Sequence, residues 1–493
     1  MSEVSLDDIV SLAKRRGFIY QGSDIYGGLA GTWDYGPLGT TLKRNIQNLW
    51  WQMFVEQRDD MYGLDAAIMM NQKVWRASGH VDTFTDPLVE CSNCHSRMRA
   101  DHIIDEAIKK NQASPSAVAT EENTPKNIEA NLGILKPKCP VCGKENTLGT
   151  PRMFNMMFKT HIGPIADQFE VTNAPEWKWK PGESRIFNDN DISWTGTNTV
   201  YLRPETAQGI FANFKNIIDT YSPDLPFGIA QIGKAFRNEI SPRDFIFRAR
   251  EFEQMEIEYF VEESKWKEEF GKWIEDVYNF LSNVGISKTD IHELEVPAAD
   301  RAHYSKRTID FEFDYAFGKS ELLGLAYRGS FDLDSHQKAS GKTMEYRPKD
   351  GSKPFVPHVI EPSFGVDRLI LAILSVAYSE DEQNGEKRIF LKLPPNIAPT
   401  KIAVSPLLKN KKELAGKAHD VYNALKKDFS GVVWDDNGNI GKRYRRQDEI
   451  GTPYCVTIDF DTLDDDTVTV RDRDTTKQER VKIDELSAKL KLS

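Results

Sequence analysis

The chain has 493 residues, of which 39% are hydrophobic, and a formal net charge of −11. This length predicts roughly two to four domains with sizeable cores, and the acidic balance excludes a generally basic coat for nucleic acids. No apolar run approaches the ~20 residues that a membrane span needs, and the acidic start lacks a signal-peptide core. We therefore expect a soluble, cytoplasmic protein that makes no membrane contact.

Two predicted helices flank a glycine-rich segment near the amino terminus. Residues 5–16 are expected to form a short helix, because Ser5 can cap it and Asp8 stands three residues on. After GGLAGTWDYGPLG at 27–39, residues 38–57 have the spacing of an amphipathic helix. The apolar stripe of that helix consists of Leu42, Ile46, Leu49 and Met53. An ordinary core-facing helix accounts for such a stripe.

Four of the five cysteines form two Cys-x-x-Cys pairs, Cys91 with Cys94 and Cys139 with Cys142. This spacing lets four thiolates reach one tetrahedral metal ion, for which zinc is the obvious candidate. Such a site is structural, because four thiolates leave no coordination position open for water or substrate. Four unmetallated thiols are the alternative, since disulfides are rare in cytosolic chains. Residues 111–127, between the pairs, are rich in small and polar residues and predict a mobile excursion.

A hairpin with unusual side chains is predicted at 233–260, GKAFRNEISPRDFIFRAREFEQMEIEYF, with a Ser-Pro-Arg turn between its strands. The period of two places Arg237 and Glu239 on one face of the first strand. One face of the second strand carries Phe252, Gln254, Glu256, Glu258 and Phe260. Three arginines have guanidinium groups suited to phosphate oxygens, namely Arg237, Arg248 and Arg250, and Phe252 can stack a base. An amphipathic hairpin with solvated charges is the alternative.

Three segments follow the hairpin. Residues 262–285 read as a helix whose aromatic repeat is more typical of packing than of RNA contact. Residues 333–357, rich in charge, glycine and proline, read as a loop excursion. HVIEPSFGVDRLILAIL at 358–374 predicts an extended segment, a Pro-Ser-Phe-Gly turn and a helix with Arg368 near its start. A buried helix with one surface arginine is the alternative, but it leaves the turn unexplained.

A proline-marked linker at 393–395 precedes short alternating strands and helices, which predict a compact α/β module of about 100 residues. This module carries the basic run Lys442-Arg443-Tyr444-Arg445-Arg446, together with Arg471 and Arg473. Cations beside an aromatic ring suit phosphates and unstacked loop bases. A solvated helix face is the alternative.

Two of these motifs resemble those of a known family. Phe236-Arg237-Asn238-Glu239, followed after a loop by Arg248, Phe252 and Glu256, resembles motif 2 of the class II aminoacyl-tRNA synthetases. The segment with Arg368 resembles the strand and helix that close the nucleotide site in that family. Within the family, the chain resembles the dimeric glycyl-tRNA synthetases from about Gly17 to about Leu486. The stretches that carry this resemblance are 27–39, RMRADH at 97–102, YLRPETAQGIF at 201–211, ELLGLAYRGSFDL at 321–333 and IGKRYRRQDEIGTPYCVTIDFDTL at 440–463.

The resemblance implies an α+β fold with an antiparallel-sheet catalytic core, a zinc-ribbon-like insertion and a C-terminal α/β anticodon-binding domain. The catalytic domain would comprise residues 1–90 and 148–392, with motif 2 at 233–260 and motif 3 at 358–374. The insertion would be 91–147 and the anticodon-binding domain 396–493. In this family the neighbourhood of the helix at 38–57 builds the dimer interface, so a homodimer is expected by resemblance alone.

The implied reaction has two steps. The carboxylate of glycine attacks the α-phosphorus of ATP and releases pyrophosphate, and a ribose hydroxyl at the 3′ end of tRNA(Gly) then takes glycine from the adenylate, releasing AMP. Because negative charge develops on phosphate oxygens, the first step needs fixed cations and positioning more than an acid or base.

The resemblance also implies the residues that bind ATP. They are Arg237, Asn238, Glu239, Phe247, Arg248, Ala249, Arg250, Glu251, Phe252, Glu321, Leu322, Gly365, Val366, Asp367 and Arg368, with Arg237, Arg248 and Arg368 in catalytic roles. Arg237 would hold the α-phosphate and the glycine carboxylate, Arg248 and Arg368 the γ-phosphate end, and Phe252 the adenine. Arg368 would also face the other side of the base. Glu239 and Glu321 would ligate Mg²⁺ that bridges the phosphates, since Mg²⁺ prefers oxygen donors.

The implied glycine site is acidic. It comprises Arg99, Glu205, Phe252, Glu253, Gln254, Met255, Glu256, Glu361, Pro362, Ser363, Phe364 and Gly365. Three carboxylates, from Glu205, Glu256 and Glu361, would surround the ammonium group, and one of them could instead be the partner of an arginine. Arg99 would reach the aminoacyl site; a surface arginine beside a zinc ribbon is the alternative. Larger amino acids would clash with the pocket walls, so no editing site is required.

Two other functions compete with this one. A non-catalytic relative would be free to lose its phosphate arginines, yet all of them are present. A synthetase for serine, threonine or proline is the second rival, but Arg-Pro-Glu-Thr at 203–206 and Glu-Pro-Ser at 361–363 are more similar to the glycine type.

Overall fold

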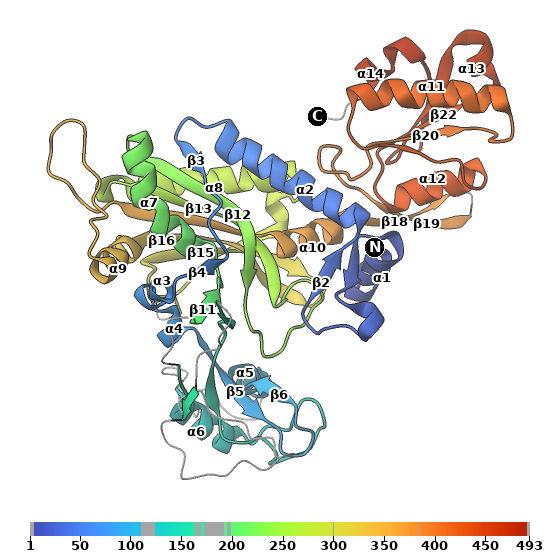
Figure 1. The fold of residues 1–493 in the computed structure, drawn as a ribbon. Helices are drawn as coiled ribbons and strands as arrows, with labels where there is room; N and C mark the ends of the chain where they lie inside the picture. Colours follow the sequence, from blue (N-terminus) through green and yellow to red (C-terminus); the bar gives the residue numbers. More distant parts are fainter. Residues whose placement is uncertain are drawn as a thin grey trace.

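The computed structural model of the chain describes residues 4–109, 124–162, 169–171, 192–194, 199–298, 300–383 and 385–490. Figure 1 shows a central body, a lobe that projects from it in light blue to teal, and a C-terminal domain in orange to red. None of the helices in the described ranges is long and apolar enough to cross a membrane.

A seven-stranded sheet forms the centre of the body. Its strand order is β14-β15-β16-β17-β13-β12-β3, and all neighbours are antiparallel except β12 and β3. The strands are β3 (Met61–Gly63), β12 (Phe227–Phe236), β13 (Glu251–Val261), β14 (Ile291–Glu295), β15 (Arg307–Tyr315), β16 (Gly318–Gly329) and β17 (His358–Gly365). The predicted hairpin at 233–260 is thus the pair β12 and β13 at the middle of the sheet.

The two faces of this sheet differ because side chains alternate along each strand. On β13, Met255 and Ile257 point into the main apolar core, whereas Gln254, Glu256 and Glu258 are buried on the opposite face. The apolar core is covered by the helices α1 (Leu6–Arg16), α2 (Pro37–Trp51), α8 (Trp266–Asn283) and α10 (Val366–Ala377). Two more helices, α7 (Ala207–Tyr221) and α9 (Phe331–Ser340), pack over one end of the other face. A polar surface is thereby enclosed between the sheet and these two helices.

The helices expected near the amino terminus are present. α1 (Leu6–Arg16) begins at Ser5 with the predicted capping box. The second predicted helix consists of α2 and a π-helical turn at Gln52–Glu56. Its Leu42 and Ile46 are fully buried in the core of the same chain, so the core-facing interpretation accounts for the apolar stripe.

Two expectations for the region after α8 are wrong. Residues 362–365 do not turn, because β17 runs unbroken to Gly365 and pairs on both sides with β13 and β16. The helix α10 follows at once. The segment 333–357 is not all loop, because α9 extends to Ser340 and buries Leu333 against the apolar cluster under α7.

The projecting lobe has its own small core. A three-stranded sheet of order β6-β5-β7 packs on two helices. The lobe extends beyond residues 91–147 on both sides, because β5 and β7, which flank that range, pair with each other. Most of the excursion expected at 111–127 lies outside the described residues, and its end forms the first turn of α6. The elements are β5 (Thr85–Glu90), β6 (Arg97–Arg99), α5 (Ala100–Lys109), α6 (Pro125–Leu135) and β7 (Arg152–Asn155).

Short elements connect the amino terminus and the lobe to the body. They are β1 (Ile19–Gln21), β2 (Trp33–Tyr35), β4 (Met69–Met70), α3 (Gln72–Ala77), α4 (His80–Thr83), β8 (Lys159–His161), β9 (Phe169–Val171), β10 (Ile192–Trp194) and β11 (Thr199–Leu202). Between the body and the C-terminal domain lies a hairpin of β18 (Tyr378–Gln383) and β19 (Glu386–Leu391), beside α12 (Ile440–Glu449) (Figure 1).

The C-terminal domain is a five-stranded sheet of order β21-β20-β22-β23-β24 with a separate apolar core. Its elements are β20 (Ile402–Pro406), α11 (Lys412–Asp428), β21 (Val432–Trp434), α12 (Ile440–Glu449), β22 (Tyr454–Ile458), α13 (Phe460–Asp465), β23 (Thr467–Asp472), β24 (Gln478–Lys482) and α14 (Leu486–Lys489). The α/β module is confirmed. The segment at 393–395 is more than a linker, because Leu393 and Ile397 are fully buried in the core of the body.

Candidate active site

A cavity of about 410 Å³ lies on the polar face of the sheet, along β13, β16 and β17. Most of the predicted site residues line it, although they come from distant parts of the chain. They are Arg99, Glu205, Arg237, Glu239, Phe247, Arg248, Ala249, Phe252, Glu253, Gln254, Glu256, Glu321, Leu322, Glu361, Ser363, Gly365, Asp367 and Arg368. The fold therefore brings the two sequence motifs to one cavity.

Seven predicted residues lie outside the cavity lining: Asn238, Arg250, Glu251, Met255, Pro362, Phe364 and Val366. Met255 and Phe364 are buried on the apolar face, as the alternation of the strands requires, and Val366, the first residue of α10, is buried in the same core. The guanidinium of Arg250 donates hydrogen bonds to the backbone carbonyls of Ala30 (2.8 Å) and Glu239 (3.2 Å). Arg250 therefore holds together the backbone around Ala30 and Glu239. A role for the seven residues in binding ATP or glycine stays a prediction.

One end of the cavity is cationic and aromatic. The guanidinium of Arg237 lies 5.2 Å from the ring centre of Phe252, and its Nε donates to the carbonyl of Pro204 at 3.0 Å. The strand β12 ends before Arg237, so this side chain and Glu239 reach the cavity from the loop and not from a strand face. The arginine is thus held by ring and backbone with further donors left for a ligand.

A second arginine faces the same end of the cavity from the first turn of α10. The guanidinium of Arg368 lies 4.7 Å from the ring centre of Phe247, and its Nη1 is 2.8 Å from Oε2 of Glu321. The helix start adds its own positive potential. Burial together with the charge of Glu321 raises the pKa of Asp310, which also lines the cavity, to about 7. Sequence reasoning missed Asp310, since nothing in a strand of alternating charge marks it.

The other end of the cavity is acidic and closely hydrogen-bonded. Glu256 accepts hydrogen bonds from Thr206 Oγ1 at 2.5 Å, from Ser363 Oγ at 2.7 Å and from Gln254 Nε2 at 3.4 Å. Glu205 lies 3.2 Å from Nε2 of His80. Burial alone would raise the pKa of Glu205, but the neighbouring His80 and Arg328 hold it well below its usual range. Hydrogen bonds thus fix both carboxyl groups in position, and the neighbours of Glu205 favour its charged form.

Arg328 is the central cation of this acidic end, and sequence reasoning missed it. It is fully buried, and it forms hydrogen bonds to both oxygens of Asp332 (2.7 and 2.8 Å) and to Glu361 (2.7 Å). Tyr304 stacks under it, 3.6 Å from the guanidinium to the ring centre. Of the three carboxylates expected around the ammonium group, Glu361 is therefore the one that pairs with an arginine. A spacing of four residues between Arg328 and Asp332 was the only sequence signal.

Arg99 reaches the cavity from the lobe. Its Nη1 is 2.6 Å from Asp86, and it forms two hydrogen bonds to Asp101, at 2.5 and 3.1 Å. Burial raises the pKa of Asp86 to about 6, although the charge of Arg99 acts in the opposite direction. Arg99 is half-buried and lines the cavity, so it is not a free surface arginine.

Comparisons with known proteins agree with this geometry. Residues 193–377 match the model of the "tRNA synthetase class II core domain (G, H, P, S and T)", and residues 401–492 match that of the "Anticodon binding domain". The chain is 49% identical over 486 residues to the glycine–tRNA ligase of Clostridium kluyveri, covering 98% of this chain and 97% of the relative. It is 45% identical over 490 residues to the glycine–tRNA ligase of Thermobifida fusca, covering 98% and 96%. The chain belongs to the glycine–tRNA ligase family.

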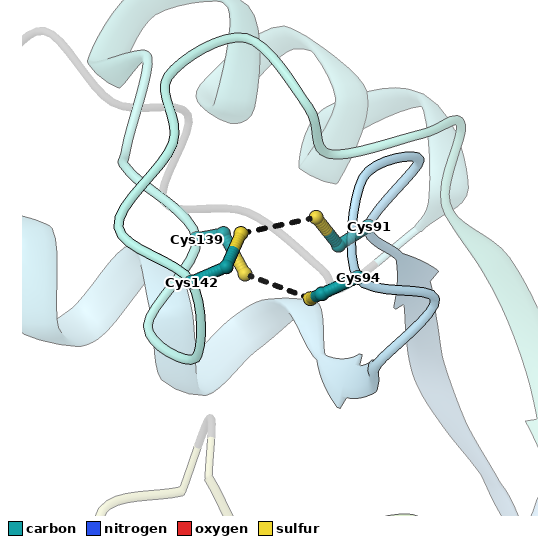
Figure 2. Close-up of side chains that lie close together, drawn as sticks. All are labelled: Cys91, Cys94, Cys139 and Cys142. Carbon is teal, nitrogen blue, oxygen red and sulfur yellow. Dashed lines mark hydrogen bonds between the residues drawn. The ribbon is translucent and has the colours of Figure 1, made fainter.

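The four predicted metal-binding cysteines come together in the lobe of this glycine–tRNA ligase family member, with their sulfur atoms facing one another (Figure 2). The sulfur atoms of Cys91 and Cys142 are 3.7 Å apart, as are those of Cys94 and Cys139, and all four lie within 4.8 Å of one another. All four thiols are free. A tetrahedral zinc ion with Zn–S bonds of about 2.3 Å requires sulfur atoms about 3.8 Å apart. The cluster therefore fits a zinc ion.

The predicted RNA-binding residues of the C-terminal domain need correction. Arg443, Arg471 and Arg473 are almost fully buried, because their guanidinium groups satisfy interior carbonyls and carboxylates. Arg446 pairs with Asp435 at 2.6 Å, and Arg445 pairs with Glu386 at 3.0 Å. Most of the basic run thus stabilises the domain and its contact with the hairpin of β18 and β19, so it is not a free phosphate-binding surface.

Proposed function

We propose that the cavity on β13, β16 and β17 activates glycine with ATP and then passes glycine to tRNA(Gly), as expected of a glycine–tRNA ligase. One observation carries the proposal. A single cavity has buried carboxylates at one end, where an ammonium group is stabilised, and two arginines that face aromatic rings at the other, where a nucleotide triphosphate is stabilised. Such a cavity binds a small amino acid beside ATP.

The acidic end would orient glycine. The ammonium group would lie among Glu205, Glu256 and Glu361. Their positions are fixed before the ligand arrives, because His80 and Gln208 hold Glu205, Thr206 and Ser363 hold Glu256, and Arg328 holds Glu361. The carboxylate of glycine would then point toward Arg237. Because these hydrogen bonds fill the end of the pocket with side chains, an amino acid with a Cβ would meet its wall. Glycine selection in this proposal is steric.

The cationic end would place ATP for in-line attack. Adenine would lie between Phe252 and Arg368, Arg237 would hold the α-phosphate, and Arg248 would neutralise the γ-phosphate end. The negative charge that develops on the α-phosphate would meet the guanidinium of Arg237 without rearrangement of the site. The leaving pyrophosphate would depart toward Arg248 and Arg368.

Mg²⁺ would be held by Glu239 and Glu321. Oε2 of Glu239 is buried and has no hydrogen-bond partner in the described part of the chain, and Glu321 is the other carboxylate at this end. Glu239 offers this unpartnered oxygen, and Glu321, which pairs with Arg368, would share its carboxylate with the ion. Such oxygen donors suit an ion that binds few protein ligands and retains phosphate oxygens. The ion would screen charge between the phosphates. Burial, together with the charge of nearby Glu321, raises the pKa of Asp310. Asp310 would therefore lie in the same surroundings as the ion.

Three features outside the cavity complete the proposal. A structural zinc ion would occupy the cysteine cluster of the lobe, and the C-terminal domain would contact the anticodon of tRNA(Gly). A homodimer is proposed as well. Its support is an exposed apolar group at 25–29, where the glycine-rich segment begins. The group consists of Ile25, Tyr26 and Leu29, with exposed fractions of 88%, 87% and 55%. A cytoplasmic location and the domain limits stay predictions.

The exchange of labelled pyrophosphate into ATP, measured without tRNA across the twenty amino acids, tests the activation step. We expect exchange with glycine alone, since only activation is required and the pocket admits no Cβ. Exchange with serine, threonine or proline would identify another synthetase. No exchange from a folded protein with Mg²⁺ would favour the non-catalytic relative. Charging of tRNA(Gly) then tests the second step.

A further inference from the structure

Glu258 is a buried carboxyl group without a role in the reaction described so far. It lies on β13, two residues beyond Glu256 on the same face, and its side chain is fully buried. Neither of its oxygens has a hydrogen-bond partner among the described residues. A carboxylate in a dry interior without a donor is costly, and such a group normally takes up a proton.

Glu258 lies close to two other buried carboxyl groups. Carboxylate oxygens of Glu256, Glu258 and Glu361 lie within 4.8 Å of one another. Burial and then the charge of Glu361 raise the pKa of Glu258 well above its usual range. The charged groups that face it are Glu256 on the same strand, Glu361 on β17, Arg328 on β16 and Asp332 on α9, with Glu205, His80 and Tyr304 beyond them.

The cations of the cluster are already engaged. Arg328 bonds to Asp332 and Glu361, and His80 pairs with Glu205. Glu256 receives three hydrogen bonds, so its charge is also stabilised. Among the carboxyl groups of the cluster, Glu258 alone receives no hydrogen bond from a described residue, although the charge of Arg328 acts on it. The acidic end thus holds five carboxyl groups, from Glu205, Glu256, Glu258, Asp332 and Glu361, against the cation Arg328 and the imidazole of His80. Negative charge is therefore in excess while the site is empty.

We propose that Glu258 is a positioning residue that holds a proton while the glycine site is empty and releases it to solvent when the ammonium group of glycine arrives. The incoming charge supplies what the cluster lacks, and the proton becomes unnecessary. Glu258 then adds a negative charge behind Glu256 and Glu361 and draws the ammonium toward them. The inference rests on the proposed function of the cavity, because it requires that an amino acid binds there.

The proposal predicts a coupling between pH and glycine binding. If one proton leaves for each glycine bound, the affinity for glycine rises by up to about tenfold per pH unit below the pKa of Glu258. In Glu258→Gln the side chain is neutral at every pH, so this gain is absent. A merely structural residue would change the affinity without changing its slope against pH.

Calorimetric titration of the full chain with glycine, in two buffers of different ionisation enthalpy, counts the released protons. At pH values above the ordinary pKa of a glutamate, about 4.3, and below the raised pKa of Glu258, we expect about one proton per glycine for the wild type and close to none for Glu258→Gln. Glu263→Gln, an exposed glutamate just beyond β13, is the matched control and should behave as the wild type. Equal proton release in the wild type and Glu258→Gln overturns the proposal, as does none in the wild type.

Pyrophosphate exchange on the same samples distinguishes a wrong role for Glu258 from a wrong function for the cavity. If glycine supports exchange but binds without proton release, the role of Glu258 is wrong and the proposed function stands. If glycine neither binds nor supports exchange, the proposed function itself fails. Should Glu258→Gln not fold, Glu258→Asp replaces it, because its shorter carboxyl group alters the pH at which the proton leaves. An unchanged pH profile in Glu258→Asp would contradict the proposal.

Discussion

Glu256 and Glu258 stand two residues apart on one strand, yet their carboxyl groups have opposite surroundings. The first receives three hydrogen bonds and the second receives none from any described residue. The period of two predicted that both side chains share a face, but it did not distinguish an accepting site from an unsatisfied one. That difference arises from Thr206 and Ser363, which are remote in sequence and close only in the folded chain.

The raised pKa of Glu258 makes the stability of the empty protein dependent on pH. A group whose pKa is raised by folding contributes stability below its unfolded value, near pH 4.3, and loses that contribution as pH rises through the folded value. Glu258→Gln removes this loss. We expect the unfolding temperature of Glu258→Gln to rise relative to that of the wild type as the pH increases from about 5 to 8. Scanning calorimetry without ligands measures this difference. A constant difference would show that Glu258 does not titrate there.

Arg237 offers a direct test of the cationic end. Arg237→Ala should lower the rate of glycine-dependent pyrophosphate exchange by about 100-fold or more, because one fixed donor to the developing charge is lost. Arg237→Lys should recover only part of the rate, since lysine lacks the planar fork. Lys215→Ala on the exposed side of α7 is the control for folding and handling. A rate within twofold of the wild type would refute the role of Arg237.

At the scale of elements, the alternation of β13 and β17 divides this chain into a core and a site. Residues 252, 254 and 256 line the cavity, while Met255 and Phe364 pack in the apolar core. This division could be predicted from the sequence. The unbroken course of β17 could not, because Pro-Ser-Phe-Gly favours a turn locally and only pairing with β13 and β16 on both sides keeps it extended.

The cysteine cluster predicts the behaviour of the lobe. We expect one zinc ion per chain by elemental analysis and loss of that ion in Cys91→Ser with Cys139→Ser. Because the small core of the lobe surrounds the cluster, the double variant should be cut faster by protease within the lobe. Cys455→Ser, the buried fifth cysteine, is the control and should retain zinc. A wild-type protein without metal would support four plain thiols.

At the scale of the whole molecule, buried arginines connect the C-terminal domain to the body. Arg388 on β19 is fully buried and binds Asp381 on β18, Asp448 on α12 and the carbonyl of Arg473. From the α1 side, Arg16 pairs with Glu449. A basic run predicts RNA contact when it is considered alone, but in the folded chain several of these cations satisfy acidic partners at the domain boundary.

Arg388→Ala tests this connection. Removal of one member of a buried ion cluster typically costs about 3 kcal/mol, so the contact between the two parts should loosen. Because the cavity lies in the body, glycine-dependent exchange should persist, while charging of tRNA(Gly) should fall. Lys387→Ala, an exposed neighbour on the same strand, is the control. Equal losses of exchange and charging would show that Arg388 acts on the catalytic body as well.

The sequence by itself determined the elements and the chemistry that local pattern encodes: the amphipathic helices, the central hairpin, the paired cysteines and the arginines of the two motifs. Only the tertiary structure decided which charges are neutralised. Arg328 satisfies Glu361, Arg443 and Arg471 turn inward, and Glu258 remains without a described partner. The physical reason is that a charge is stabilised by groups within a few ångströms, and those groups come from elements far apart along the chain.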